Sequence, residues 1–162
     1  MLGAGENRGI VATVLRCGFF YGADTAAYET DGRWTQKRAF PIIGDGEALW
    51  SLIHIDDVAS AFAAAALEDL PGIWHVVDDR PVKTGDFLSY FAGRIGAQRP
   101  YRFPVWLARF LAGSYAVEFF TASNNTSSAK LKAASSWSPK YPTYREGIPE
   151  VVREWKAEGF LL

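Results

Sequence analysis

Two short apolar runs constrain the fold of this 162-residue chain more than any other feature. Ile10–Leu15 is an almost continuous run rich in β-branched residues, and Ile73–Val77 has a similar character. Runs without polar alternation are typical of strands that are buried on both faces, as in a parallel sheet. A helix pattern lies between them, so the two strands are predicted to form a crossover unit. We therefore expect an α/β fold.

The stretch Ile42–Glu68 lies between these two strands in the sequence. Ile42–Ile43 and Leu49–Ile55 flank Gly44-Asp45-Gly46. Because Asp-Gly is a strong turn signal, we predict a hairpin about this turn. The second segment runs into an alanine-rich helix pattern, and Asp56 is placed to cap that helix with its carboxylate.

The remainder of the chain is predicted to be mostly helical. A helix is expected over Asp86–Ile95 with Thr84 as its cap, and a last helix is expected to end near Glu158, before Gly159. Thr143 and Glu146 have the spacing of a capping box at the start of that last helix. Between these two helices, a set of large residues is predicted to form an apolar helix face: Trp106, Leu107, Phe110 and Leu111.

Charge and cysteine content exclude several classes of protein. The net charge is −1, with 17 basic and 18 acidic residues interspersed, so we expect no nucleic-acid or membrane partner. Cys17 is the only cysteine, which precludes an internal disulfide and favours a cytoplasmic location. Residues 1–9 lack the apolar core of a signal peptide and are expected to be a flexible lead to a single domain over residues 1–162.

Most of the apparent chemical motifs have structural explanations. The glycines within residues 3–9 precede a strand instead of following one, so they are not expected to bind a dinucleotide. The two histidines, His54 and His75, have no metal-ligand spacing with Cys17, and no metal site is expected. Ser51, His54 and Asp57 have the residue types of a catalytic triad but lie on one strand and its adjoining turn, so we predict a structural role for His54.

A predicted loop, Arg16–Ala23, follows the first strand. In open α/β sheets the ligand crevice lies at the carboxyl ends of the strands, so this loop is the first candidate wall of a site. Its aromatic residues, Phe19, Phe20 and Tyr21, either line that site or belong to the core. The same two interpretations apply to Trp50.

Four groups of residues, in this order, resemble the NAD(P)-dependent epimerase/dehydratase family, the extended short-chain dehydrogenase/reductases. They are Leu15-Arg16 with Phe20-Tyr21-Gly22, then Ile43-Gly44-Asp45-Gly46, then the segment from Ile53 to Ala59, and finally Trp137, Pro139, Tyr141 and Gly147. The resemblance implies a partial Rossmann-type sheet, comprising its last two strands, and a small, mostly helical substrate-binding lobe. It also implies that this chain is the C-terminal half of such an enzyme.

The resemblance further implies an NAD or NADP cofactor. In this family a glycine-rich loop and a Tyr-x-x-x-Lys pair, both in the N-terminal half, carry the cofactor and the acid–base chemistry. None of the seven tyrosines in this chain has a lysine four residues later. We therefore expect no catalytic residues here, and neither cofactor binding nor turnover by this chain alone.

Candidate contacts follow from the same resemblance. Cofactor contacts are expected from Cys17, Gly18 and Phe20, and substrate contacts from Phe19, Tyr21, Trp50, Ser51 and Arg80. Nucleotide-sugar members carry asparagine at the position of Phe19 and Arg-Asp at Trp50-Ser51. The expected substrate is a sugar or a related small molecule. Because Phe and Trp cannot replace charge-assisted bonds to phosphate, a less charged and partly aromatic substrate is the alternative to a nucleotide sugar.

Two interpretations of function stay open. The chain is either the substrate-binding half of an NAD(P)-dependent epimerase, dehydratase or reductase, or a non-catalytic module that self-associates. In both cases the first strand has an edge without a partner, which invites pairing with an N-terminal half or with a second copy.

Overall fold

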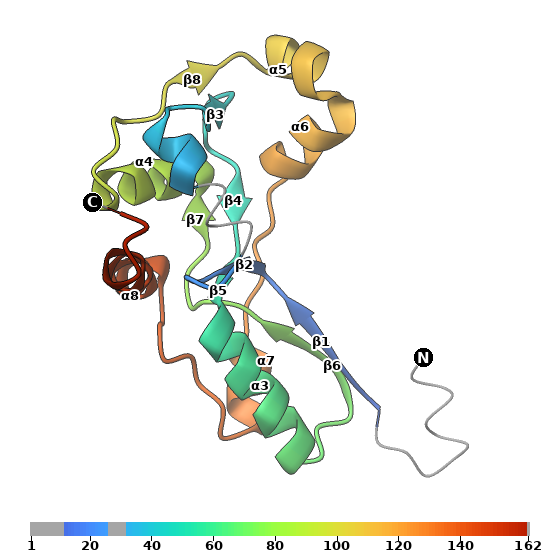
Figure 1. Ribbon diagram of the computed structural model, residues 1–162. Helices are drawn as coiled ribbons and strands as arrows, with labels where there is room; N and C mark the ends of the chain where they lie inside the picture. Colours follow the sequence, from blue (N-terminus) through green and yellow to red (C-terminus); the bar gives the residue numbers. More distant parts are fainter. Residues whose placement is uncertain (1–11, 26–31, 162) are drawn as a thin grey trace.

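The computed structural model describes residues 12–25 and 32–161, so the predicted lead over residues 1–9 lies outside it (Figure 1). Strands β1 (Thr13–Cys17) and β6 (Gly72–Val76) pair in parallel, with Thr13 opposite Gly72 and Cys17 opposite Val76. Helix α3 (Ile55–Leu67) contacts β1, and α7 (Ala129–Ala134) contacts β6. The predicted parallel pair is confirmed. We call these four elements the sheet unit.

The first strand changes partner halfway along its length. Its continuation, β2 (Phe19–Tyr21), pairs in parallel with β5 (Leu52–His54). The Gly18 amide donates to Val76 O at 3.0 Å, and the next amide, of Phe19, donates to Ser51 O at 2.9 Å. A Cβ atom at position 18 would lie 2.3 Å from Ser51 O, so only glycine fits this crossing. The loop expected over Arg16–Ala23 is therefore wrong, because most of it is strand.

The predicted hairpin is also wrong, although its turn is confirmed. Gly44 and Gly46 have φ angles of 70° and 69°. However, β3 (Ile42–Ile43) pairs with β8 (Arg102–Phe103), and β4 (Leu49–Trp50) pairs with β7 (Val82–Lys83). Gly46 O accepts a hydrogen bond from the Gly85 amide at 2.9 Å. This contact ties the turn to the next helix, so the two flanking segments find separate partners.

The start of α3 differs from the prediction. The N-cap is His54, whose Nδ1 accepts a hydrogen bond from the Asp56 amide at 3.2 Å, so capping by the Asp56 carboxylate is wrong. The neighbouring carboxylate, of Asp57, accepts hydrogen bonds from the amides of Lys140 and Tyr141 at 2.6 and 3.0 Å. Asp57 thus fastens the segment after α7 to the first turn of α3.

Helices α4 (Thr84–Arg94) and α8 (Tyr144–Ala157) pack against each other. The N-cap of α4 is Lys83 and its side chain makes no capping bond, so the predicted Thr84 cap is wrong. The capping box of Thr143 and Glu146 is confirmed, and Gly159, with φ 74°, follows the end of α8 as expected.

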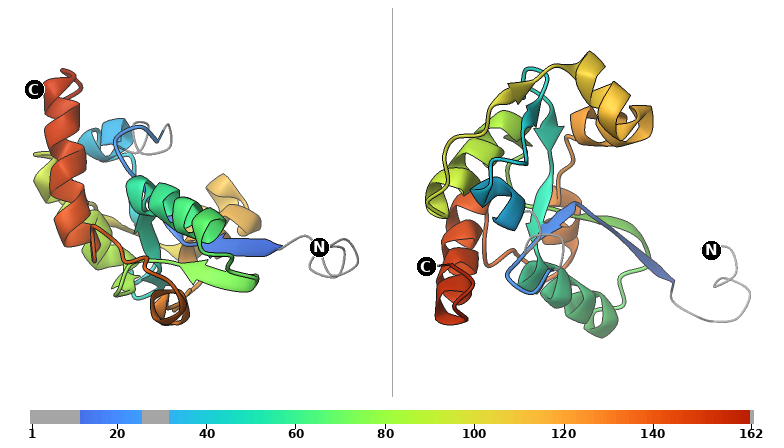
Figure 2. Two further views of the ribbon diagram at one scale, coloured as in Figure 1. Left: turned by 90° about the horizontal axis from the view of Figure 1, so that it is seen from below. Right: turned by 45° about the horizontal axis from the view of Figure 1, so that its top comes forward.

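A hairpin of two short helices, α5 (Val105–Ala112) and α6 (Ser114–Thr121), lies at the top of Figure 1, away from β1 and β6. The right-hand view of Figure 2 shows the same separation from another direction. The predicted apolar face lies on α5, and its residues Trp106, Phe110 and Leu111 are 71%, 83% and 67% exposed. The two helices pack mainly on each other, which buries only small inner residues such as Ala108 and Val117.

A group of aromatic side chains lies among the α5–α6 helix pair, helix α4 and strands β3, β4 and β8. We call this part, including residues 32–40, the aromatic lobe. In the part of the chain that the structure describes, no helix is both long and apolar enough to cross a membrane.

Candidate functional site

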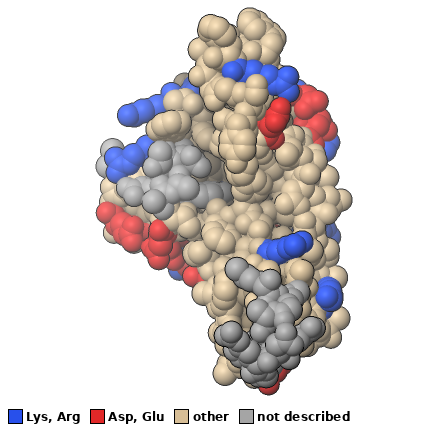
Figure 3. Space-filling view, turned by 90° about the vertical axis from the view of Figure 1, so that its right-hand side faces the viewer, with Lys and Arg blue, Asp and Glu red and all other residues tan. Residues whose placement is uncertain are grey.

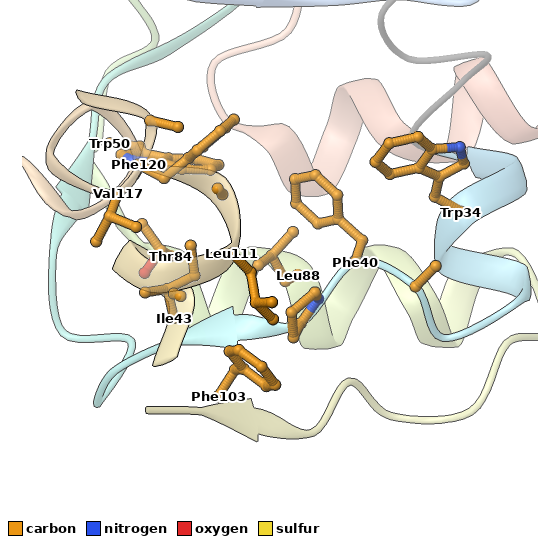
Figure 4. A pocket seen from close by; sticks show the side chains of 15 residues that line it. Trp34, Phe40, Ile43, Trp50, Thr84, Leu88, Phe103, Leu111, Val117 and Phe120 are labelled. Carbon is orange, nitrogen blue, oxygen red and sulfur yellow. The ribbon is translucent and has the colours of Figure 1, made fainter. Parts of the chain in front are cut away.

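Two adjoining apolar cavities lie in the aromatic lobe. Their volumes are about 220 Å³ and about 280 Å³, and both are lined by Phe40, Trp50, Leu88 and Phe120. Figure 4 shows Trp50 and Phe120 at one end of the first cavity and Trp34 at the other. No described residue that lines either cavity carries a charge. Concave apolar sites of this size are suited to small, weakly polar molecules.

The second cavity brings together residues that are far apart in the sequence. Phe19 at the start of β2 and Trp50 at the end of β4 have ring centroids 5.1 Å apart. Phe119 meets Phe19 edge to face at 5.3 Å. Phe20, which is 45% exposed, also lines this cavity. Phe19 and Trp50, both candidate substrate contacts, thus share one wall.

Two buried polar atoms accompany these aromatic walls. Trp50 is 7% exposed and Thr35, which lines the second cavity, is 2% exposed. Neither Trp50 Nε1 nor Thr35 Oγ1 has a hydrogen-bond partner within the described residues. Buried polar groups are normally paired, so these two atoms mark a place where a ligand could supply the missing partner.

Two other candidate substrate residues, Tyr21 and Ser51, line neither cavity. Tyr21 is fully buried, and its hydroxyl donates to Asp78 Oδ2 at 3.3 Å. Ser51 Oγ donates to Asn124 O at 2.8 Å and accepts from the Thr126 amide at 2.9 Å. The hydroxyl groups of both residues are therefore engaged within the chain.

Arg80 lies in a different place. It is exposed and lines a polar hollow of about 660 Å³, together with Lys83 and Glu146. This hollow shares no lining residue with the two apolar cavities. The structure therefore groups Phe19, Phe20 and Trp50, and separates Arg80 from them.

A pair of buried titratable side chains flanks Tyr21. Burial raises the pKa of Asp78 to about 7, against the opposing effect of its hydrogen bond from Tyr21. Burial also lowers the pKa of His54, whose ring lies 5.1 Å from that of Tyr21, although Asp56 and Asp57 oppose this shift. Both groups are thus held toward their neutral forms.

The candidate cofactor residues Cys17, Gly18 and Phe20 lie at the junction of β1 and β2. Gly18 is required by the packing of its strand against Ser51 O, and burial raises the pKa of the Cys17 thiol. The helices that follow strands β5 and β7 have acidic first turns, with Asp56 and Asp57 in α3 and Asp86 in α4. Carboxylates in these positions would repel a pyrophosphate, so these two helix N-termini do not fit a dinucleotide phosphate. No cluster of metal-ligating side chains occurs among them either.

Several cavity residues were not anticipated from sequence. Phe40, Leu88, Val117 and Phe120 come from three separate segments, the last two from α6, and each looks like an ordinary core residue in its own segment. The adjacent aromatic residues Phe119 and Phe120 are the one local sequence signal for a cavity wall, and both line the second cavity.

Comparison with known proteins identifies the fold. No family model matches the chain. It is 30% identical over 142 residues to a 3-diazoavenalumate denitrifying reductase from a Streptomyces species, a match that covers 86% of this chain and 46% of the relative. The chain therefore spans about half the length of this curated relative.

Solved structures show the same relation. The human epimerase family protein SDR39U1, with NADPH, superposes with a TM-score of 0.80 at 16% identity, covering 89% of this chain and 49% of the human one. A protein of unknown function from Silicibacter pomeroyi gives 0.74 at 24% identity, covering 91% and 50%. The Thermus thermophilus UDP-glucose 4-epimerase, with NAD, gives 0.69 at 23% identity, covering 95% and 49%.

These matches confirm the resemblance to the NAD(P)-dependent epimerase/dehydratase family and the partial Rossmann-type α/β fold that it implied. The chain corresponds to about half of each relative, and this half includes the aromatic lobe with its two cavities.

Proposed function

We propose that this chain is the substrate-binding half of an NAD(P)-dependent oxidoreductase of the epimerase/dehydratase type. The observation that carries the proposal is the pair of cavities that share Trp50, the second of which is also lined by Phe19, where β2 follows β1. In open α/β folds the ligand crevice lies at the carboxyl ends of the parallel strands. The Streptomyces relative is named as a reductase, which agrees with this assignment.

In this proposal the cofactor is bound mainly by residues outside this chain. NAD(P) supplies hydride transfer in such enzymes, and the present residues contribute a dry, apolar site that holds the substrate against it. The acidic first turns of α3 and α4 and the packing role of Gly18 support placing the pyrophosphate elsewhere.

The edge of β1 is where the remaining half would join. Among the described residues β1 pairs with β6 alone. A groove of about 330 Å³ beside it is lined by Thr13, Leu15 and Phe62, with Phe62 56% exposed. The face that carries β1 and α6 is largely uncharged in its middle (Figure 3). An uncharged face next to an unpaired strand is suited to covering by another protein segment.

The test has two steps. Calorimetric titration of the chain with NADH and NADPH is expected to show no binding below millimolar concentrations. A chimera that places the unmatched part of the Streptomyces relative before this chain is expected to bind one of them at micromolar concentration. Tight cofactor binding by the chain alone, or a folded chimera that binds neither cofactor, would contradict the proposal.

The second candidate function is a non-catalytic module that self-associates through β1. The unpaired edge of β1 and the exposed Phe62 favour it. Sedimentation at increasing concentration separates the candidates. The second candidate would be favoured by two results together: Leu15→Lys abolishes a dimer of this chain, and the folded chimera binds neither NADH nor NADPH.

A further inference from the structure

The buried tryptophans of this chain differ in one respect. Four of the six are buried: Trp50, Trp74, Trp137 and Trp155. Three of these donate their indole N–H to backbone carbonyls: Trp74 to Leu70 O at 3.0 Å, Trp137 to Asp57 O at 3.2 Å, and Trp155 to Ala23 O at 3.2 Å. Trp50 Nε1 has no partner among the described residues. A buried tryptophan usually pairs its N–H, so Trp50 departs from the pattern of its own fold.

Trp50 also differs from the other three buried tryptophans in its position. Its indole lines both cavities, whereas the other three buried tryptophans line neither. A second buried polar atom without a partner, Thr35 Oγ1, belongs to a residue that lines the second cavity. The indole N–H can only donate a hydrogen bond, so it requires an acceptor, while the hydroxyl can donate or accept.

We propose that these cavities bind an uncharged, flat aromatic molecule that carries one hydrogen-bond acceptor, with Trp50 Nε1 as the donor to it. The inference rests on the proposed function for its identification of the ligand as substrate. The binding itself requires only the aromatic lobe and the neighbouring strands β2 and β5 of this chain.

The volume of the site agrees with a ligand of this class. An engineered apolar cavity of about 150 Å³ binds benzene. Cavities of about 220 and 280 Å³ therefore have room for one ring with a short substituent. Figure 4 shows the elongated arrangement, with Phe40 and Leu88 between the Trp50 end and the Trp34 end.

The walls favour aromatic over aliphatic ligands. Phe40 and Phe120 meet edge to face with ring centroids 6.0 Å apart, and Phe119 and Phe120 do so at 5.4 Å. A flat ring inserted among them can make the same offset and edge-to-face contacts. A diphosphate is excluded, because no described cavity residue has a charge to pair with it.

The experiment uses calorimetry on the whole chain with three probes. The probes are trans-cinnamamide, which has a ring and a carbonyl acceptor, trans-β-methylstyrene, which lacks the acceptor, and UDP. We expect saturable binding of one cinnamamide per chain and no binding of UDP. Trp50→Phe keeps an aromatic ring but removes the donor, so it should weaken cinnamamide about three- to tenfold. It should leave β-methylstyrene within about twofold.

Two matched variants locate the site. Ala116 lines the first cavity, so Ala116→Leu should fill it and weaken cinnamamide at least tenfold. Ala133, exposed on α7, is the control, and Ala133→Leu should leave affinity unchanged. Circular dichroism confirms that each variant is folded.

Three outcomes would overturn the inference: no saturable cinnamamide binding, binding indifferent to Ala116→Leu, or UDP binding that competes with cinnamamide. Its failure is distinguishable from failure of the proposed function. A chimera that binds NADPH while this chain ignores cinnamamide overturns the ligand class alone. Cinnamamide binding beside a chimera that binds neither cofactor overturns the enzyme assignment alone.

Discussion

Asp57 and Trp137, which join α3 of the sheet unit to the C-terminal segment, and Trp50 of the aromatic lobe differ in how their buried polar atoms are paired. At α3, both carboxylate oxygens of Asp57 accept backbone hydrogen bonds, and the indole N–H of Trp137 donates to Asp57 O and Ser60 Oγ. In the aromatic lobe, Trp50 Nε1 and Thr35 Oγ1 have no partner within the described residues. The same lobe contains both of the apolar cavities.

This difference separates support from binding. A satisfied hydrogen-bond network and close packing hold one arrangement of the backbone. Cavities and unpaired donors instead reduce stability, because they forgo contacts that the chain could have made. The sheet unit therefore provides the rigid base, and the lobe retains the room and the donor that a small molecule needs.

The largest expected effect is on stability and concerns Asp57 in the sheet unit. Asp57→Ala leaves the amides of Lys140 and Tyr141 without their acceptor, and should lower the free energy of unfolding by about 3 kcal/mol. Asp56→Ala is the matched control, because that side chain is 56% exposed, and it should cost less than about 0.5 kcal/mol. Urea unfolding measures both. Equal effects would show that Asp57 does not fasten the C-terminal segment.

The next prediction concerns the junction between the two regions. At Gly147 of α8 a Cβ atom would lie 2.4 Å from the hydroxyl oxygen of Tyr21, so Gly147→Ala should cost about 2 kcal/mol. In α4, a Cβ at Gly93 would meet nothing within 4 Å, and Gly93→Ala should stabilise by about 0.5–1 kcal/mol. Thermal unfolding compares them. A stabilising Gly147→Ala would contradict the close packing of Tyr21 on α8.

Asp78 makes the junction sensitive to pH. Its folded-state pKa is raised from 3.8 to about 7, so the folded protein binds a proton more tightly than the unfolded chain. The resulting stability is fully present below about pH 4 and is lost as the pH rises through about 7. Between pH 5 and 7 the wild type should lose about 1 kcal/mol per pH unit from this group, and Asp78→Asn should remove that slope. Urea unfolding across this range decides, and an unchanged slope would exclude Asp78 as its source.

The smallest expected effect is the difference in stability between two tryptophan variants, one from each region. Trp50→Phe and Trp137→Phe remove the same atoms, but only the second leaves carbonyl and hydroxyl oxygens without their donor. Trp137→Phe should therefore be about 1 kcal/mol more destabilising. Denaturant unfolding of the two variants in parallel checks this. If they were equally destabilising, the Trp50 N–H would have a partner within the folded chain.

The features that sequence predicted correctly are local or strongly periodic. The parallel pairing of β1 with β6, the capping box of Thr143 and Glu146, and the turn at Gly44 and Gly46 all depend on residues close in sequence or on continuous apolar runs. The resemblance to the epimerase/dehydratase family was carried by motifs of the same kind. Phe19 and Trp50 were singled out through that resemblance, and the structure places them side by side.

The errors have a common physical origin, which is competition between partners distant in the chain. The Gly-Asp-Gly turn adopts its expected conformation, but Gly85 takes its carbonyl and the flanking strands pair elsewhere. The N-cap of α3 is His54 and not Asp56, because Nδ1 of His54 accepts the hydrogen bond from the Asp56 amide in the first turn.

The sequence by itself determined the α/β class, the parallel strand pair and the ends of the last helix, because hydrophobic periodicity and backbone preferences act within a few residues. Only the tertiary structure decided that Asp57 joins α3 to the C-terminal segment and that Trp50 faces two cavities with its N–H unpaired. These features depend on which side chains from separate segments fill the same space, and that is settled only when all the segments pack together.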